Sequence, residues 1–466
     1  MMARDYRGSV PDLAASAPTE PPASIVVVGA GLAGLRTVAE LRAQGFVGSI
    51  TVVGAETVPP YDRPPLSKEL FAKTEPVWLS GEGFGELTDL ADRVLLGHRA
   101  SALHAVDDGV TLTVTPAGAP DAAPDAAPSE PLSADAAPDA APGEPLSADA
   151  VVLATGAAPV VPAGWDGATI LHTADDAARL RAALSPGARV VVIGAGWIGA
   201  EVAGQAAARG CDVTVVEAAP TPLYRQLGAT LGERTRPWYA AAGVTLRTSC
   251  PVTAVRPGEV HLTRRDGAAE RLAADVVLAA VGVRPVTGWL GGAFPLTPRG
   301  ALRVDPVGRV AGAPASVRAV GDCVDMEVPG VGLVPGGHWD AALTHPAALV
   351  ADLLGQARPP LAAPYVFSTQ LGHDLALVGM PDDDASLVLR GDPGGAWTAL
   401  LVEPAKDGAT GVLLAGFTVD RPRDVGPLRK LLADGARPVL DLTRAADPAV
   451  QLRRAVLTAD RAAGPA

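Results

Sequence analysis

Two segments of the chain carry the same glycine pattern, each placed between an apolar run and a stretch of helical character. The pattern G-x-G-x-x-G occupies Gly29–Gly34 after the run Ile25–Val28, and Gly194–Gly199 after the run Val190–Ile193. Its first glycine permits a tight turn, its second lets the backbone approach a pyrophosphate, and its third lets a helix pack on a strand. The N-terminus of that helix faces the phosphates. Two such patterns predict that one chain holds two dinucleotides, as an electron-transfer flavoenzyme does.

An acidic residue follows each glycine pattern. Glu56 stands 22 residues after Gly34, and Glu217 stands 18 residues after Gly199. A carboxylate about 20 residues beyond the glycines usually binds an adenosine ribose. We expect this role for Glu217 and Glu56; Ala55 or the backbone is the alternative at the first site, and a solvent-facing strand end is the alternative at both. Because a carboxylate would repel a 2′-phosphate, Glu217 predicts NADH rather than NADPH.

Two further segments could place charged groups against a bound cofactor. Tyr61–Lys68 (YDRPPLSK) has two prolines that fix an extended entry and is expected to be helical from Leu66. Lys68 would then lie near a helix start, where the dipole disfavours a cation, which indicates a purpose such as facing a flavin ring; a solvated surface lysine is the alternative. Asp322 ends a short apolar run and could accept a hydrogen bond from a polyol such as ribityl, an interaction of roughly 1.5–3 kcal/mol. The alternative is an aspartate that caps the following segment.

The elements that must position these residues alternate between short strands and helices. The pattern predicts an α/β fold: two Rossmann-like dinucleotide-binding units and, from about Pro329, an α+β unit. Predicted helices are Leu32–Gln44, a stretch from about Ile198 to Arg209, and Val425–Ala433. Besides the two runs before the glycines, the predicted strands are Ile50–Val53, Val151–Ala154, Val213–Val216, Val276–Val281, Leu375–Val378, Leu387–Leu389, Thr398–Val402 and Val412–Thr418.

A low-complexity stretch at residues 117–149 separates the two units. It contains Ser129–Ala136 and a near repeat, Gly143–Ala150, fourteen residues later. Its seven carboxylates and lack of Lys and Arg contribute −7 of the net charge of −13. An Ala/Pro/Asp composition cannot bury enough surface to offset its ordering entropy. We interpret it as a duplicated hairpin loop whose second copy leads directly into the strand at residues 150–154.

Composition excludes several classes of protein. A net charge of −13 argues against general nucleic-acid binding, and no apolar run reaches the roughly 18 residues of a membrane span. Residues 1–23 lack the apolar core of a secretory signal and are expected to be disordered. Three cysteines cannot form a disulfide framework, which favours a reducing cytoplasm. The seven histidines show no metal-binding spacing.

The order of these motifs, together with His338–Ala342 (HWDAA), gives the chain a family resemblance. It resembles the FAD-dependent NADH–ferredoxin (or rubredoxin) reductases, the putidaredoxin-reductase-like group that serves cytochrome P450 and ring-hydroxylating oxygenase systems. The resemblance covers residues 24–432 apart from the acidic stretch. It implies a glutathione-reductase-like division: an FAD domain (24–160 and 286–328), an NADH domain (161–285) and a C-terminal reductase domain (329–466) that covers the flavin.

The resemblance also assigns residues. It implies that Lys68 and Glu201 are catalytic, with Glu201 on the nicotinamide side; the alternative for Glu201 is an ordinary polar residue in an Ala-rich helix. Trp339 is implied to lie beside the flavin. The FAD site is expected to include Gly29, Gly31, Leu32, Ala33, Gly34, Ala55, Glu56, Arg63, Lys68, Ala100, Thr155, Gly156, Asp322 and Trp339. The NADH site is expected to include Gly194, Gly196, Trp197, Ile198, Gly199, Glu217 and Gly282.

The sequence departs from the family at several positions. A basic residue is common where Val160 stands, and Gly337 and Ala341 replace a glutamate and an asparagine. A tryptophan and an acidic residue are common in the segment that here reads Phe367–Gln370 (FSTQ). These departures put individual flavin contacts and the partner surface in doubt, not the fold.

The cysteine pattern indicates where electrons leave. Related disulfide reductases carry C-x-x-C or C-x4-C near the flavin, whereas Cys211, Cys250 and Cys323 are far apart. Electrons should therefore pass directly to an external one-electron acceptor such as a ferredoxin. The alternatives are an NADH oxidase or diaphorase, or an NADH-sensing flavoprotein. Since ferredoxins are usually acidic, a local basic patch is needed for steering; the candidates are Arg421, Arg423, Arg429 and Lys430, with a solvated face as the alternative.

Overall fold

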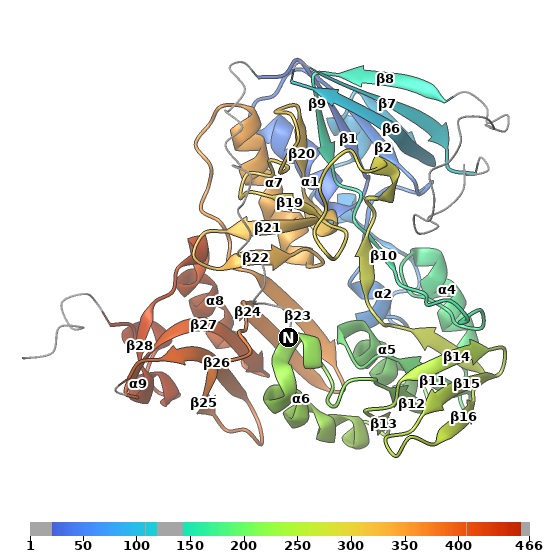
Figure 1. The fold of residues 1–466 in the computed structure, drawn as a ribbon, viewed down its shortest axis with the longest axis vertical. Coiled ribbons are helices and arrows are strands. Elements are labelled where there is room, and N and C mark those ends of the chain that lie inside the picture. The colour runs from blue at the N-terminus through green and yellow to red at the C-terminus, as the bar shows by residue number, and fades with distance from the viewer. Residues whose placement is uncertain (1–20, 108, 119–142, 407, 458–466) are drawn as a thin grey trace, which may run out of the picture.

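A computed structural model describes residues 21–107, 109–118, 143–406 and 408–457. Its ribbon has three lobes: the first glycine pattern lies in the upper lobe, the second in the lower right lobe, and residues beyond about 365 form the lower left lobe (Figure 1). The N-terminal stretch 1–20 and most of the acidic stretch, including Ser129–Ala136, lie outside the described residues. Within the described part of the chain, no helix is long and apolar enough to cross a membrane.

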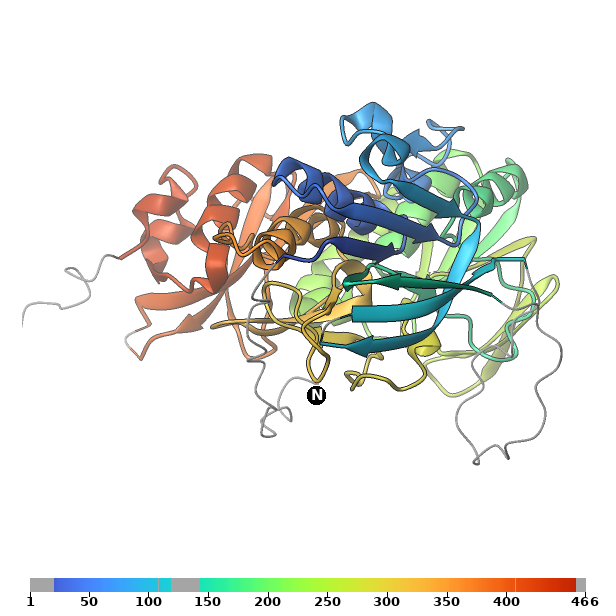
Figure 2. The ribbon, with the colours of Figure 1, turned by 90° about the horizontal axis from the view of Figure 1, so that it is seen from above.

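The upper lobe is built on a parallel sheet of order β20-β9-β1-β2-β5. Helices α1 and α7 cover one face, and the antiparallel sheet β6-β7-β8 covers the other (Figures 1 and 2). Ile25 and Val27 of β1 pack toward the helices, whereas Val26 and Val28 pack toward the second sheet. Because side chains alternate across a strand, a continuous apolar run is what a strand buried on both faces requires. The bounds are β1 Ser24–Val28, α1 Leu32–Ala43, β2 Ser49–Gly54, β5 Arg93–Leu96, β6 His98–Val106, β7 Gly109–Pro116, β8 Glu144–Ala148, β9 Ala150–Leu153, β20 Val317–Ala319 and α7 Trp339–Leu353.

Smaller elements complete this lobe. They are β3 Tyr61–Asp62, α2 Pro65–Lys68, β4 Val77–Trp78, α3 Leu87–Leu90, β19 Leu302–Val304, β21 Val324–Val328 and β22 Gly332–Pro335, with 3-10 turns at Leu79–Glu82, Gly288–Leu290 and Gly321–Cys323.

The lower right lobe repeats the plan with a parallel sheet of order β13-β12-β11-β17. Val190 and Val192 of β11 pack toward the helices, and Val191 and Ile193 pack toward an antiparallel meander. The two lobes are joined by an antiparallel pair, β10 with β18. The bounds are β10 Ala157–Pro159, α4 Ala174–Ala183, β11 Arg189–Ile193, α5 Trp197–Ala208, β12 Asp212–Val216, α6 Tyr224–Ala241, β13 Thr245–Arg247, β14 Val252–Arg256, β15 Glu259–Thr263, β16 Ala269–Ala273, β17 Val276–Ala279 and β18 Val283–Pro285.

The lower left lobe is a six-stranded antiparallel sheet, with β28 paired to β27 beside the path β23-β24-β27-β26-β25. Leu223, Leu227 and Leu231 share one apolar cluster with Trp397 and Phe417 of this sheet, so the second lobe packs against the third. The bounds are β23 Tyr365–Gln370, β24 His373–Gly379, β25 Ser386–Gly391, β26 Trp397–Pro404, β27 Thr410–Val419, α8 Pro422–Leu431, β28 Val439–Asp441 and α9 Leu442–Ala446, with 3-10 turns at Ala433–Gly435 and Leu452–Arg454.

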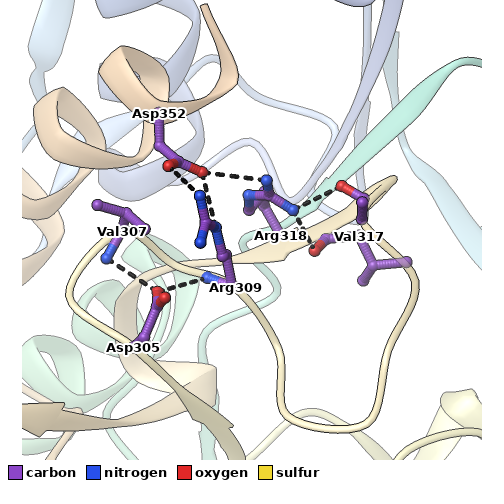
Figure 3. A network of polar contacts seen from close by, with 7 residues as sticks. Asp305, Val307, Arg309, Val317, Arg318 and Asp352 are labelled. Atoms are coloured by element: carbon purple, nitrogen blue, oxygen red, sulfur yellow. Dashed lines mark hydrogen bonds and ion pairs between the residues drawn. The ribbon is translucent and has the colours of Figure 1, made fainter. Parts of the chain in front are cut away.

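A largely buried ion-pair network ties α7 to the edge of the first sheet (Figure 3). The carboxylate of Asp352 accepts from Arg309 at 2.6 and 3.1 Å and from Arg318 at 3.1 Å. Arg318, in β20, is 1% exposed and also donates to the carbonyls of Ala315 and Val317. Because burying a guanidinium is costly unless it is paired, this carboxylate holds the helix against the strand.

The predicted α/β fold is confirmed. The interpretation of the second acidic copy as part of a loop is wrong, because Glu144–Ala148 forms the strand β8 and pairs with β7 before the chain enters β9.

One expectation about the Tyr61–Lys68 segment is wrong: the two prolines do not form an extended entry, because Pro64 has helical φ and ψ of −51° and −38° and Pro65 begins α2. The helix is only four residues long, so Lys68 is at once near its start and its last residue, and a single turn has little dipole. The dipole argument for a special role of Lys68 therefore fails, and its role must be judged from its contacts.

Candidate functional site

The two glycine patterns adopt the same backbone geometry. Gly29 and Gly194 have φ of +120° and +105°, and a Cβ on either would lie 2.1 or 2.4 Å from a carbonyl oxygen of the neighbouring strand end. A Cβ on Gly34 or Gly199 would lie 1.8 or 2.0 Å from the carbonyl oxygen of the first glycine in the same pattern. Only glycine fits at these four positions, as the roles of tight turn and close helix packing require.

The middle glycines face open space. A Cβ on Gly31 or Gly196 would meet nothing within 4 Å. Each residue is the N-cap of its helix, α1 or α5, and no side chain caps either helix. The first-turn N–H groups are thus left to a ligand, and a pyrophosphate fits both cradles.

Glu217 lies at the end of β12 and reaches the second cradle. Its carboxylate accepts from the N–H of Ala195, inside the glycine pattern, and from the N–H of Ala219, both at 2.7 Å. These bonds fix the carboxylate beside the cradle, where an adenosine ribose is expected. The ribose contact itself stays a prediction.

The structural counterpart of Glu217 in the first unit is Gly54, not Glu56. The N–H of Gly194 bonds the carbonyl of Val216, and the N–H of Gly29 bonds that of Val53, so the next residue along corresponds in each unit. A Cβ on Gly54 would lie 2.5 Å from the Cβ of Ala30. Glu56 and Glu217 are therefore not structurally equivalent. Sequence spacing did not reveal this, because the segment between the glycine pattern and the acidic residue differs in length between the two units.

Glu56 instead binds the Tyr61–Lys68 segment. Its carboxylate accepts from the Tyr61 hydroxyl at 2.6 Å and pairs with Arg63 at 2.5 Å. Burial of the ring raises the pKa of Tyr61 to about 12. Arg63 also donates to the carbonyl of His172 in the second lobe. The predicted cofactor roles of Glu56, Ala55 and Arg63 stay predictions.

Asp322 lies against the start of the first helix. The preceding Gly321 has φ of +82°, and a Cβ there would lie 2.9 Å from the Cβ of Ala33 in α1. The Asp322 carboxylate accepts from the N–H of Gly337 at 3.1 Å, and burial raises its pKa. The structure thus brings together Asp322, the first cradle and the residues that precede Trp339, although they are far apart in sequence.

Lys68 and Glu201 form an ion pair between the first and second lobes. Lys68 Nζ lies 2.5 Å from Glu201 Oε1, and Glu201, in α5, is 2% exposed. The other carboxylate oxygen accepts from Ser67 Oγ at 2.5 Å, and Oε1 also accepts from Ser368 Oγ at 2.6 Å. A third segment, β23, therefore contributes to the predicted catalytic pair.

An aromatic ring contacts this pair, and a second ring packs against the first. The indole N–H of Trp339 donates to Asp62 at 2.6 Å. Phe367 lies edge-on to Trp339 with ring centroids 6.0 Å apart, and Lys68 Nζ lies 5.0 Å from the Phe367 centroid. The residues that sequence reasoning missed are Asp62, Ser67, Phe367 and Ser368. Phe367 and Ser368 lie in the segment that departs from the family pattern, and this was the one signal that could have found them.

Other predicted site residues have structural contacts. Thr155 Oγ1 donates to the carbonyl of Val286 at 2.7 Å, and the carbonyl of Gly282 accepts from Val160 N–H at 3.0 Å; these bonds join the crossover segments. Ala100, in β6, packs against the core between the two sheets of the first lobe. Leu32 and Gly156 are partly buried, Trp197 packs on the cluster shared with the third lobe, and Ile198 is exposed. Their cofactor contacts stay predictions.

The thiols and imidazoles near the site are shielded. Cys211, Cys250 and Cys323 are all buried and belong to three different apolar clusters, so no two of them form a dithiol. Burial lowers the pKa of His338 to about 4, which keeps it neutral at pH 7 and suits its place at the N-cap of α7. Among the residues that the structure describes, no His/Cys/Asp/Glu group could hold a metal ion.

The proposed basic patch is partly wrong. Arg421 is buried and pairs with Asp424 at 2.5 Å. Arg429 pairs with Asp340 at 2.8 Å and lies over the ring of Tyr365 at 4.5 Å. Both guanidiniums are thereby used inside the fold, while Arg423 and Lys430 are exposed on α8.

Comparison with known proteins agrees with this geometry. Residues 23–341 match the family described as pyridine nucleotide-disulphide oxidoreductase, and residues 365–456 match a family described as reductase C-terminal. The chain is 31% identical to the ferredoxin–NAD(+) reductase component of the anthranilate 1,2-dioxygenase system of Burkholderia cepacia, over 92% of this chain and 98% of that protein. Among solved structures, it resembles Fdr9 (35% identity, TM-score 0.75, covering 92% of this chain and 99% of that one). It also resembles putidaredoxin reductase in its covalent complex with putidaredoxin (25% identity, TM-score 0.77, covering 95% and 99%).

Proposed function

Because the chain belongs to the pyridine nucleotide-disulphide oxidoreductase family and ends in a reductase C-terminal domain, we propose that it is an FAD-dependent NADH–ferredoxin reductase serving a P450 or other oxygenase. The observation that carries this proposal is the pair of matching glycine cradles, at Gly29–Gly34 and Gly194–Gly199, in one chain. The relative from Burkholderia cepacia is named as the reductase component of such an oxygenase system.

FAD and NADH fit the two cradles. When bound, FAD accepts a hydride from NADH and gives single electrons to an iron–sulfur protein. The chain supplies position and electrostatics: the cradles hold the pyrophosphates, and the Lys68–Glu201 pair fixes a positive charge between the first and second lobes. A preorganised cation in a site shielded from water can stabilise negative charge that develops nearby. Phe367 places its ring beside the Lys68 ammonium, 5.0 Å from Nζ to the ring centroid.

The acceptor is a ferredoxin or similar small iron–sulfur protein. The three cysteines are buried in separate clusters and supply no internal relay, so electrons leave the cofactor without a dithiol step. A cytoplasmic location, and a division into 24–160 with 286–364, 161–285 and 365–466, belong to the same proposal. The last boundary lies later than the expected residue 329, because β22 pairs with β21 and α7 packs on α1. The pairing of β20 with β9 supports the return of the chain to the first domain.

Stopped-flow mixing tests the whole proposal. FAD-loaded protein is reduced with NADH and then mixed with an oxidised ferredoxin. Rapid flavin reoxidation that requires the ferredoxin supports the reductase. Reoxidation by oxygen or quinone at the same rate would indicate an oxidase or diaphorase, and a long-lived reduced complex with little turnover would indicate a sensor; either result contradicts the proposal.

Nucleotide preference is expected to depend on Glu217. Its carboxylate, held by two backbone N–H groups, would repel a 2′-phosphate, so kcat/KM for NADH should exceed that for NADPH at least about tenfold, or roughly 1.4 kcal/mol. Glu217→Ala should remove most of this preference, whereas Glu233→Ala, an exposed glutamate of α6, should not. Equal steady-state rates with both nucleotides in the unmutated protein would refute the assignment.

Partner steering is expected to depend on the exposed basic residues of α8. Reversing Arg423 and Lys430 to glutamate should slow ferredoxin reduction several-fold at low salt and flatten its salt dependence, because charge steering is screened by ions. Arg256→Glu is the matched control; it lies in β14, on the opposite side of the molecule from α8 (Figure 1). An unchanged rate and salt dependence in the double variant would exclude α8 from the steering surface.

A further inference from the structure

Glu201 is a buried carboxylate at the meeting point of all three lobes. It belongs to α5 of the second lobe, and its donors come from the Tyr61–Lys68 segment of the first and from β23 of the third. At 2% exposure it has almost no water around it. A charge removed from water needs hydrogen-bond donors to compensate for lost hydration, so whatever supplies them also fixes where the carboxylate points.

Two of its three donors are serine hydroxyls. Ser67 donates to one oxygen at 2.5 Å, while Ser368 and Lys68 share the other at 2.6 and 2.5 Å. Both oxygens are therefore engaged, and Lys68 is held by a carboxylate that cannot rotate without breaking a bond. Ser368 shares the oxygen that carries the ion pair, so its hydroxyl bears directly on the position of Lys68.

The third lobe holds Ser368 in this role. Gln370 donates to Ser368 Oγ at 3.3 Å, which leaves the serine proton for Glu201. A Cβ added to Gly204 of α5 would lie 3.2 Å from the backbone nitrogen of Leu371, so helix and strand end are packed closely. Hydrogen bonds in such chains reinforce one another.

We propose that Ser368 is a positioning residue for the Glu201–Lys68 pair, through which the C-terminal lobe takes part in NADH oxidation and does not only cover the cofactor. The proposal rests on the proposed function, since it concerns the same pair. Ser368 acts through Glu201 and is not itself assigned a contact with either nucleotide.

A double-mutant cycle of Ser368→Ala and Glu201→Gln tests this. In the unmutated background, Ser368→Ala should lower the rate constant of flavin reduction by NADH about tenfold. The dissociation constant for NAD+, measured by calorimetry, should stay within about threefold of its value in the unmutated protein. In the Glu201→Gln background, Ser368→Ala should lower the same rate constant less than about twofold, because the effects of mutating residues that act as a unit do not add. Ser368→Thr keeps the hydroxyl and should restore most of the rate. Thr369→Ala, the exposed next residue of β23, is the matched control.

The same four proteins are also compared by their unfolding midpoints, a measurement that needs no enzyme activity. Ser368→Ala should lower the midpoint less in the Glu201→Gln background than in the unmutated background. An equal tenfold loss in both backgrounds, or a Ser368→Ala protein with the unmutated rate, would overturn the proposal. If the unmutated protein fails to oxidise NADH, the proposed function is wrong, and the unfolding cycle then decides the coupling of Ser368 to Glu201 by itself.

Discussion

Gly199→Ala is expected to lower kcat/KM for NADH at least about a hundredfold while FAD stays bound. The new Cβ would lie 2.0 Å from the carbonyl oxygen of Gly194 and 3.1 Å from its carbonyl carbon. Backbone cannot yield as a flexible side chain can, so α5 must move away from β11, and the cradle formed by its N-terminus opens. A hundredfold loss corresponds to roughly 2.7 kcal/mol. Flavin content is read from visible absorbance, and kcat/KM from NADH oxidation with an artificial acceptor.

The first glycine pattern provides the counterpart of this prediction, and α8 provides a control. Gly34→Ala places its Cβ 1.8 Å from the carbonyl oxygen of Gly29, and should instead yield protein that does not retain FAD. Gly426→Ala, in α8, meets nothing within 4 Å and should keep both properties. Loss of FAD from Gly199→Ala, or normal NADH kinetics in it, would show that the two cradles are not assigned as proposed.

Asp352→Ala is expected to destabilise the first lobe by about 3–5 kcal/mol, the usual cost of breaking a buried ion pair. The change removes the carboxylate that Arg309 and Arg318 share, and Arg318 is 1% exposed (Figure 3). A guanidinium left in the core without a counter-charge cannot recover its hydration. Because α7 carries Trp339 and packs on α1, the loss should appear as FAD release, seen by flavin fluorescence, at lower urea concentration.

An exposed ion pair serves as the comparison for Asp352. Glu233→Ala breaks a pair with Arg236 on the surface of α6, and such pairs contribute less than about 1 kcal/mol. The urea midpoint for FAD release should therefore hardly change. A similar, small shift in both variants would mean that the network at Asp352 does not hold α7 in place.

Much of the fold could be read from local patterns. The β-branched runs before Gly29 and Gly194 are strands buried on both faces, and the glycines that follow them sit where a side chain would collide with backbone. Such positions are specified within some ten residues of chain, because a backbone that needs positive φ or close approach leaves only one residue type. Strand β23 and helix α7 were not predicted as a strand and a helix, although the family resemblance points to Trp339 of α7 and to the segment Phe367–Gln370 of β23.

Assignments that depended on position in space were less secure. Glu56 and Glu217 looked equivalent by spacing, but the sheet register makes Gly54 the counterpart of Glu217. Arg421 and Arg429 looked like a surface patch, but each pairs with a buried aspartate. Sequence spacing does not say which face of an element meets another lobe.

The sequence by itself determined two dinucleotide cradles, three structural units and the absence of a cysteine pair with redox spacing. Through a family resemblance it also predicted roles for Lys68, Glu201 and Asp322. Only the tertiary structure decided what holds Glu201. Its partners Ser67 and Ser368 stand 134 and 167 residues away. A turn is encoded by the residues that form it, whereas these contacts exist only when three separately built lobes pack together.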